Sequence, residues 1–243
     1  MPNAVALDNV QHHDLKVISG HGPQYGDAIN EVAVFCNEFA EVQREYPIYF
    51  RRDERGGLQA YALLGLDKGE NLFLDEGTWQ ARYIPAMQDR GPFMIGFRER
   101  EDAGEVKREP TMAVNLDDPR VSHDEGHPLF LPQGGNSPHL ERHARALRTI
   151  HSGVEQSRGM FNAFIQAGLI AAVQIEVKLD DSTEYNIPEI FSISQEALNK
   201  LDGATLERLN KQGYLGLAYY ALASLGNVRR IIEMKNQRRA VLV

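Results

Sequence analysis

The sequence predicts an α+β protein with a mostly antiparallel sheet built from hairpins, one long central helix and a helical C-terminal segment. Short β-rich runs separated by turn signals occupy residues 47–74 and 169–193, and closely spaced strands of this kind pair as hairpins. Between these regions, apolar residues recur at spacings of three and four from residue 137 to 168, which is typical of one amphipathic helix. After residue 193 the pattern changes from strand to helix.

The N-terminal third contains short strands and one helix. The β-rich runs predict strands at residues 15–18, 47–52, 58–66 and 71–74, with Gly-containing turns at 54–57 and 67–69. Between the first two strands, Phe35, Phe39 and Val42 recur at spacings of four and three. We therefore expect an amphipathic helix of about three turns that ends before Pro47.

The middle of the chain alternates between buried and exposed segments. An aromatic stretch at 78–86 leads to a turn and a buried strand at 91–97, and residues 111–116 predict another strand. The charged residues 98–109 between them predict an exposed hairpin tip or loop. Residues 117–135 are rich in Asp, Gly and Pro and predict a long polar loop.

Ser137 and Pro138 are a good helix start, with Ser as the N-cap and Pro at the first helical position. The helix that follows should run for about 28 residues and end at Gly168. Strands at 169–179 and 185–193 should form another hairpin, and helices should then begin at residue 194, at 202–209 and at 213–235.

Length, charge and cysteine content exclude several classes of protein. The 243 residues fit one domain covering 1–243, with a C-terminal helical subregion at about 194–238, although one domain with a small subdomain is also compatible with this length. The net charge of -8 argues against nucleic-acid binding. Cys36 is the only cysteine, so an intrachain disulfide is impossible, and a reducing compartment is compatible with the sequence.

The apolar windows are too short for a bilayer span, and the first residues lack the pattern of a secretory signal, so we expect a cytoplasmic protein that is not an integral membrane protein. One cationic cluster lies near the C-terminus, at Arg229, Arg230, Lys235, Arg238 and Arg239. It favours a helix end whose charges complement the helix dipole and face solvent. The alternative is a patch for an anionic membrane or partner.

Motifs for nucleotide binding and covalent catalysis are absent from the sequence. The Gly20-His21-Gly22-Pro23 segment lacks the Lys-Ser/Thr ending of a phosphate-binding loop, and no Gly-x-Ser-x-Gly elbow occurs. Cys36 lies on the predicted apolar helix face, as expected of a buried structural thiol. We therefore expect no cofactor of these classes.

Five of the eight histidines, His123, His127, His139, His143 and His151, fall within a short stretch. His139 and His143 are four residues apart, which places them on one helix face, where they can chelate a divalent metal. His123 and Glu125 form a His-x-Glu pair, as in the facial triad of non-haem iron oxygenases. Those enzymes use a jelly-roll core, whereas this pair lies in a loop before a helix, so we favour no metal site.

Residues 75–97 hold the remaining candidates for binding. Trp79 is followed by Arg82, Tyr83 and Arg90, and an Arg stacked on an aromatic ring leaves its guanidinium available to a carboxylate. The alternative is a structural corner in which Trp79 fills the core and Arg82 binds loop carbonyls. The acidic pair Asp117-Asp118 favours a turn at a strand end, and paired acid–base chemistry would require a second carboxylate pair nearby.

Together these segments resemble the SapC-related family of bacterial proteins. The matching stretches are residues 73–97, 115–130, 137–170 and 190–231. The family pattern is a Trp-x-x-x-Tyr-x-Pro, an Arg-x-Pro-Phe core, an acidic strand end, an Asp/Glu-Gly-x-Pro-Leu-Phe turn and a terminal Leu-x-Ser-Leu-Gly. Its places are filled by Trp79, Tyr83, Pro85, Arg90, Pro92, Phe93, Asp117, Gly126, Pro128, Leu129, Phe130, Ser224, Leu225 and Gly226.

The resemblance implies an association with surface-layer protein export, which the family name carries, and no established activity. It also implies gene clusters with TonB-dependent receptors, flavin-dependent halogenase-like proteins and cupin-like proteins. Histidines 123, 139, 143 and 151 are outside the family pattern.

These observations lead to a main functional hypothesis and two alternatives. The main one is a non-enzymatic accessory protein of a bacterial envelope system that recognises a peptide or protein through Trp79, Arg82, Tyr83, Arg90, Asp117 and Asp118. The first alternative is a metal-dependent oxygenase or hydrolase that uses His123, Glu125 and one of His139, His143 or His151. The second is a homo-oligomer formed through the apolar C-terminal helix, although an apolar helix of this kind is more typical of a core.

Overall fold

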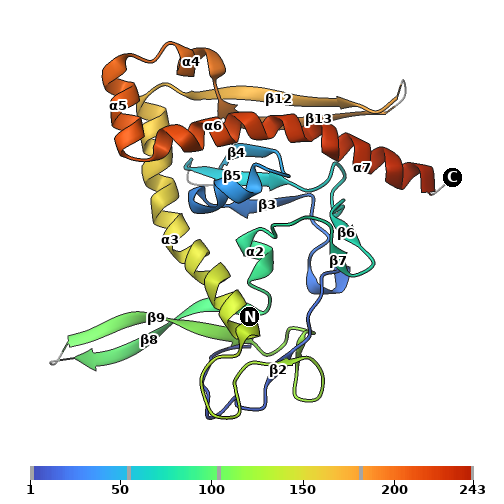
Figure 1. Cartoon of the computed structure of the whole chain (residues 1–243), viewed down its shortest axis with the longest axis vertical. Helices are drawn as coiled ribbons and strands as arrows, with labels where there is room; N and C mark the ends of the chain where they lie inside the picture. The colour runs from blue at the N-terminus through green and yellow to red at the C-terminus, as the bar shows by residue number, and fades with distance from the viewer. Residues whose placement is uncertain (1–2, 54–55, 103–104, 181–182, 242–243) are drawn as a thin grey trace.

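The computed structural model describes residues 3–53, 56–102, 105–180 and 183–241, and it confirms the α+β fold. The molecule is elongated, with a sheet and the C-terminal helices toward one end and a hairpin with short strands toward the other (Figure 1). The long helix α3, Pro138–Gln166, runs between the two ends. The remaining helices are the short α1 (Phe39–Val42) and α2 (Ala86–Asp89), followed near the C-terminus by α4 (Gln195–Asn199), α5 (Gly203–Lys211), α6 (Tyr214–Ser224) and α7 (Val228–Val241).

The larger end is built on a five-stranded antiparallel sheet. Its order is β12 (Ile170–Lys178), β13 (Glu184–Ile193), β4 (Ile48–Arg52), β5 (Leu58–Leu63) and β3 (Glu31–Val34). The predicted hairpins β4–β5 and β12–β13 meet where Phe191 pairs with Phe50. The two-stranded ribbon of β6 (Leu74–Asp75) and β7 (Thr78–Trp79) follows the first hairpin in the chain.

The smaller end contains two three-stranded sheets. One has the order β1 (Ala4–Ala6), β9 (Glu105–Asn115) and β8 (Phe93–Asp102), and the other β10 (Val121–Ser122), β2 (Lys16–Val17) and β11 (His127–Pro128). The charged segment 98–109 continues the strands β8 and β9 and so forms an extended hairpin, as the sequence allowed. Residues 103–104, between the two strands in the sequence, lie outside the described part of the chain.

Buried apolar side chains form two clusters, and α3 contributes to both of them. Leu140 and Leu147 join the cluster at the smaller end, together with Leu15, Val17 and Phe93. Further along the helix, side chains that include Met160, Phe161 and Phe164 pack into the larger cluster beneath the sheet. The number of domains stays a prediction, but the long helix is what joins the two clusters.

The start of α3 agrees with the prediction. The Ser137 hydroxyl accepts the Leu140 amide at 3.2 Å, and Pro138 is the first helical residue. The helix has 29 residues and is followed by Gly168 at φ 66°. In its middle, Gly153 lies so close to residue 35 that an added Cβ would be 2.5 Å from the Phe35 Cβ.

The predicted helix of about three turns ending before Pro47 is wrong. Residues 31–34 form strand β3, residues Cys36–Glu38 form a 3₁₀ turn, and only Phe39–Val42 are α-helical. The buried Glu38 carboxylate accepts the Phe35 amide at 2.9 Å, which caps the turn at this point. The apolar spacing of 35, 39 and 42 was therefore produced by a turn followed by a single helical turn.

The predicted helix at 213–235 is divided into α6 and α7 by a 3₁₀ turn at Leu225–Asn227. The buried Ser224 hydroxyl donates to the Ala221 carbonyl at 2.6 Å and accepts the Ile48 amide at 2.8 Å, and such local bonds compete with regular helix. Tyr219 and Tyr220 on α6 are exposed, so this helix is not buried all round. Self-association through it stays a prediction.

No helix within the described residues is both long enough and apolar enough to cross a membrane.

Candidate functional site

Trp79 is a core residue. Its ring is 7% exposed, it stacks on Phe73 with 6.5 Å between ring centroids, and its Nε1 donates to the Tyr46 hydroxyl at 2.7 Å. The cation–π contact in this region is made by another arginine than the predicted Arg82. The guanidinium of Arg230 from α7 lies 5.3 Å from the centroid of the Phe73 ring. The structure therefore agrees with the alternative of a structural corner at this residue.

Hydrogen bonds fix the backbone of the corner at Arg82 and Tyr83. The amide of Arg82 donates to the Glu45 carboxylate at 2.8 Å, and the Tyr46 hydroxyl donates to the Tyr83 carbonyl at 2.6 Å. The Tyr83 hydroxyl and the Ala86 amide donate to Glu38 at 2.8 and 3.0 Å. Burial raises the pKa of Glu38, although these donors favour its charged form. The corner is thus held by two carboxylates from the segment around α1.

A groove lies between this corner and α3, and we call it the arginine groove. Its volume is about 530 Å³. One wall is the corner with Arg82, Tyr83 and Ile84, and α2 supplies Ala86 and Asp89. The helical wall is a stripe with the spacing i, i+3, i+4 and i+7, formed by Arg142, Arg145, Ala146 and Thr149.

The charges in the arginine groove are unbalanced. The Arg142 guanidinium donates from Nε to Asp89 at 2.8 Å, and their side chains are 49% and 19% exposed. Within the described residues, the guanidinium groups of Arg82 and Arg145 have no hydrogen-bond or ion-pair partner. The groove therefore carries three guanidinium groups and one carboxylate, in a protein whose net charge is -8. This is an anion-binding arrangement.

The other predicted binding residues lie apart from the groove. Arg90 donates to the Phe93 carbonyl at 2.7 Å, and burial lowers its pKa, with Arg120 close by. Asp118 accepts two bonds from the guanidinium of Arg120, at 2.9 and 2.7 Å, which helps to lower the pKa of this half-buried carboxyl. Asp117 is exposed and accepts the Asn3 amide at 3.0 Å. These three residues have structural partners in the smaller end.

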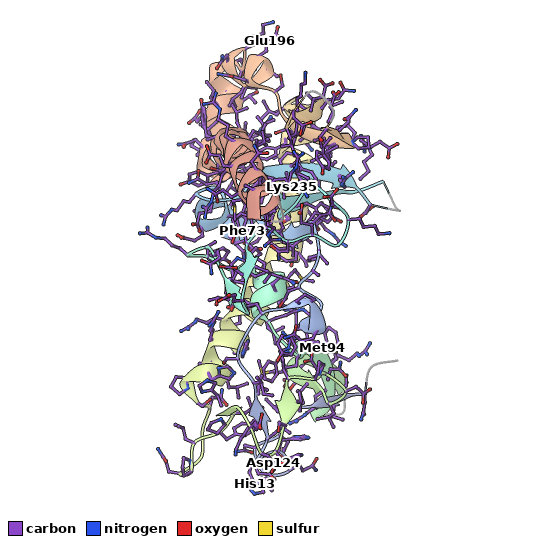
Figure 2. All side chains as sticks on the ribbon, turned by 90° about the vertical axis from the view of Figure 1, so that its right-hand side faces the viewer. His13, Phe73, Met94, Asp124, Glu196 and Lys235 are labelled. Carbon is purple, nitrogen blue, oxygen red and sulfur yellow. The ribbon has the colours of Figure 1, made fainter. Side chains whose placement is uncertain are left out.

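The structure separates the candidate metal ligands. His123 pairs with Asp14 at 3.1 Å, and Glu125 is exposed in the same loop, whose Asp124 is labelled at the lower end of the molecule in Figure 2. His139 and His143 meet on α3, with 3.3 Å between their Nε2 atoms. Among the described residues, no group of three or more His, Cys, Asp or Glu side chains is placed to hold a metal ion.

Sequence reasoning missed Arg142 and Arg145 as groove residues. Together with Arg148 they recur every three residues in the segment predicted as the long helix, so a basic stripe on one face could have been found. What the sequence could not supply is the opposite wall, because residue 82 is far from residue 145 along the chain. The α2 helix at 86–89, which carries Asp89, was also not predicted.

The family described as SapC matches residues 7–231 of the chain. No curated protein matches it, and no solved structure does.

Proposed function

The chain belongs to the SapC family, and from this premise we propose that it is a cytoplasmic, non-enzymatic accessory protein of a bacterial envelope system that binds an acidic peptide or protein segment in the arginine groove. The envelope system would be surface-layer export, which the family name carries, or TonB-dependent nutrient uptake. The observation that carries the proposal is the pair of unpartnered guanidinium groups, Arg82 and Arg145, on opposite walls of one groove.

Carboxylate is the ligand chemistry that this groove fits. A guanidinium donates two parallel hydrogen bonds to a carboxylate, and such charge-assisted bonds are about twice as strong as neutral ones. Arg82 and Arg145 face the groove from different elements, so one ligand with two carboxylates can engage both. Arg142 is half-exposed and already paired with Asp89, so Arg82 and Arg145 are the two groove guanidinium groups left for a ligand.

The rest of the groove favours a peptide over a nucleic acid. Tyr83, Ile84 and Ala146 give it an apolar component on which side chains or a backbone can pack. Polyphosphate chains need a continuous basic surface, whereas this protein has 34 acidic against 26 basic residues. A short acidic segment needs only the local positive potential of the groove.

The frame of the groove is rigid, which supports specific binding. The backbone at Arg82 is fixed by Glu45, and Tyr83 is fixed by Glu38 and Tyr46. The opposite wall is a long regular helix. A site whose walls are ordered before binding loses less conformational entropy on association.

The proposal is tested by binding of the purified protein to an array of synthetic peptides with increasing Asp and Glu content. We expect binding to rise with acidic content and to fall at least tenfold in the Arg82→Ala/Arg145→Ala variant. Arg158→Ala is the matched control, because Arg158 is exposed on the same helix and outside the groove. Binding that ignores acidic content, or that is lost equally in the control, would overturn the proposal.

The envelope assignment needs its own experiment. Crosslinking in the bacterial host should capture a discrete envelope or export protein with the unaltered chain and with Arg158→Ala. The same partner should be absent with Arg82→Ala/Arg145→Ala. If the captured proteins are the same for all three chains, the groove is not the binding surface.

A further inference from the structure

A second cavity lies between α3 and the extended hairpin β8–β9, and we call it the hairpin cavity. Its volume is about 280 Å³, and the hairpin lines it with Ile95, Pro110 and Met112. The helical lining is a stripe with the spacing i, i+3, i+4 and i+7, formed by Ala144, Leu147, Arg148 and His151. This stripe is shifted by two residues from that of the arginine groove, which is about 200° around the helix. The two cavities therefore lie on nearly opposite sides of α3.

An apolar face of the hairpin continues beyond its contact with α3. Residues that pair directly across the two strands share a face, and the pairs on this face are Phe93 with Val114, Ile95 with Met112 and Phe97 with Pro110. The first pair is fully buried, the second is partly buried, and Phe97 is 57% exposed. The hairpin projects away from α3 (Figure 1). The hairpin and the helix thus diverge and leave an apolar crevice between them.

The charged group in the lining of the hairpin cavity is a cation with free donors. The Arg148 side chain is 65% exposed, and its guanidinium is 3.7 Å from the Glu141 carboxylate, which is longer than a hydrogen bond. His151 is exposed, and its ring has no hydrogen-bond or ion-pair partner within the described residues. None of the acidic side chains in the described part of the chain lines the cavity. An anionic group is therefore the complement of this lining.

The size of the hairpin cavity suits a single alkyl chain. A methylene group packed at the density of a protein interior takes up about 27 Å³, so the cavity has room for about eight to ten carbons. A stable protein partner would need about 800 Å² of surface on each side, far more than this crevice offers. Small-molecule sites are mostly apolar with a few polar groups that fix the orientation of the ligand, and this lining has that composition.

We propose that the hairpin cavity binds a straight-chain fatty acid of about eight to ten carbons. Its alkyl chain would lie against Ile95, Met112 and Leu147. Its carboxylate would accept hydrogen bonds from the guanidinium of Arg148 and from the ring of His151, since a neutral imidazole carries one N–H donor. The site shares no residue with the arginine groove and is independent of the peptide proposed there.

The test is calorimetric titration of the full chain, purified without detergent, with the saturated monocarboxylates from butanoate to dodecanoate, each kept below its micelle-forming concentration. Each buried methylene should strengthen binding about fourfold, until the chain fills the cavity at octanoate or decanoate and the affinity levels off. Octanol should bind about tenfold more weakly than octanoate, because it lacks the charge that Arg148 pairs with. Affinity that ignores chain length, or that is equal for octanol and octanoate, would overturn the proposal.

Two variants separate the apolar and the charged part of the hairpin cavity. Ala144→Leu adds an isopropyl group to the lining, so the chain length at which affinity levels off should be shorter by about three carbons. Arg148→Met keeps an apolar stem and should abolish the preference for octanoate over octanol. Arg158→Met is the control, because Arg158 is exposed on α3 and outside the cavity. An unchanged length series in Ale144→Leu, or an unchanged preference in Arg148→Met, would contradict the proposed site.

NMR of methyl-labelled methionines locates the ligand in the unaltered chain. Octanoate should shift the Met112 methyl signal and leave that of Met94 in place, because Met94 lies on the other face of the hairpin. A peptide that ends in leucine also offers an apolar group and a carboxylate, and it should bind more weakly than octanoate. The proposal is overturned if this peptide binds more tightly than octanoate, or if octanoate leaves the Met112 signal unchanged.

Discussion

The arginine groove and the C-terminal helix α7 both carry several cations, and they use them in opposite ways. Four of the five cations of α7 are occupied by the protein itself, and the exposed Arg229 is the exception within the described residues. Arg230 pairs with Glu45, Lys235 with Asp67 and Glu70, and Arg239 with Asp180. Arg238 donates to three carbonyls of the segment 71–74. In the groove, Arg82 and Arg145 have no such partners within the described residues.

We call the four residues Arg230, Lys235, Arg238 and Arg239 the α7 clasp. Figure 2 marks Lys235 on this helix and Phe73 in the segment that the clasp holds. A cation that already has buried partners stabilises the fold and has little left for a ligand, whereas an unpartnered cation on a rigid frame is available. The comparison therefore favours a structural role for the clasp, and it supports the proposal that the groove binds a ligand.

The clasp also changes the interpretation of the cationic cluster. The sequence favoured charges that face solvent at a helix end, with an anionic membrane or partner as the alternative. Lys235 is only 8% exposed and lies between two carboxylates of the 67–70 turn, so it is an internal ion pair. Pairs across such distances in the chain leave no pattern in local spacing.

The largest change in the free energy of unfolding is expected from Trp79→Ala. Removing a buried aromatic side chain leaves a cavity and costs about 3–5 kcal/mol in the free energy of unfolding. Trp79→Phe keeps most of the volume but loses the bond to Tyr46, and should cost about 1–2 kcal/mol. Urea unfolding measures both. An unchanged stability of Trp79→Ala would place this residue on a binding surface instead of in the core.

The second-largest loss of stability is expected from a variant of the α7 clasp. Lys235→Met leaves the Glu70 carboxylate, which is 14% exposed, without its cation. Breaking a buried pair costs about 3–5 kcal/mol, but Asp67 is 52% exposed and solvent screens part of the loss. We therefore expect about 2 kcal/mol of destabilisation by urea unfolding and unchanged affinity for acidic peptides. Lys211→Met in α5 is the control, because its pair with Glu207 is exposed.

A smaller effect on free energy is expected for Arg145→Ala in the groove. The stability should stay within about 0.5 kcal/mol of the unaltered protein, as for surface substitutions without partners. The affinity for an acidic peptide should fall several-fold, and the loss should shrink as salt is added, since exposed charges are screened. Loss of affinity that is insensitive to salt would indicate a packing role.

The smallest expected effect is a pH dependence of stability that originates at His139, beside the arginine groove. Burial, with His143, His127 and Arg142 close by and opposed by Asp89, lowers the pKa of His139 to about 4. The unfolded state then binds more protons than the folded state below about pH 6.5. Stability should therefore fall as the pH drops from about 6.5 to about 4. In His139→Gln, the profile from urea unfolding at several pH values should be flatter; an identical profile would contradict this origin.

The elements with strong local signals were predictable from the sequence. The helix α3 was predicted from Ser137, Pro138 and its apolar spacing, and the hairpin β12–β13 from two β-rich runs around a short turn. The predicted three-turn helix before Pro47 was wrong, because Phe35, Phe39 and Val42 keep helical spacing across a turn capped by a buried carboxylate. Apolar spacing does not show where a polar side chain will compete for the backbone, as Glu38 does three residues from Phe35.

Two of the six predicted binding residues line the arginine groove, and their role in binding stays a prediction. Arg82 and Tyr83 were expected to bind, and they line the groove. Arg90, Asp117 and Asp118 were expected beside them, but each has partners in the smaller end. Whether a charged residue is available to a ligand depends on whether it finds a partner inside the protein. Such partners are set by tertiary contacts between distant segments.

We propose that the groove cations bind a ligand and that the clasp cations stabilise the fold. The most direct test measures, for two variants, both the free energy of unfolding and the affinity for one acidic peptide selected on the array. Arg82→Ala/Arg145→Ala should lose at least tenfold in affinity with stability within about 0.5 kcal/mol, and Lys235→Met should lose stability with its affinity unchanged. A groove variant that is destabilised but binds the peptide normally would contradict the account.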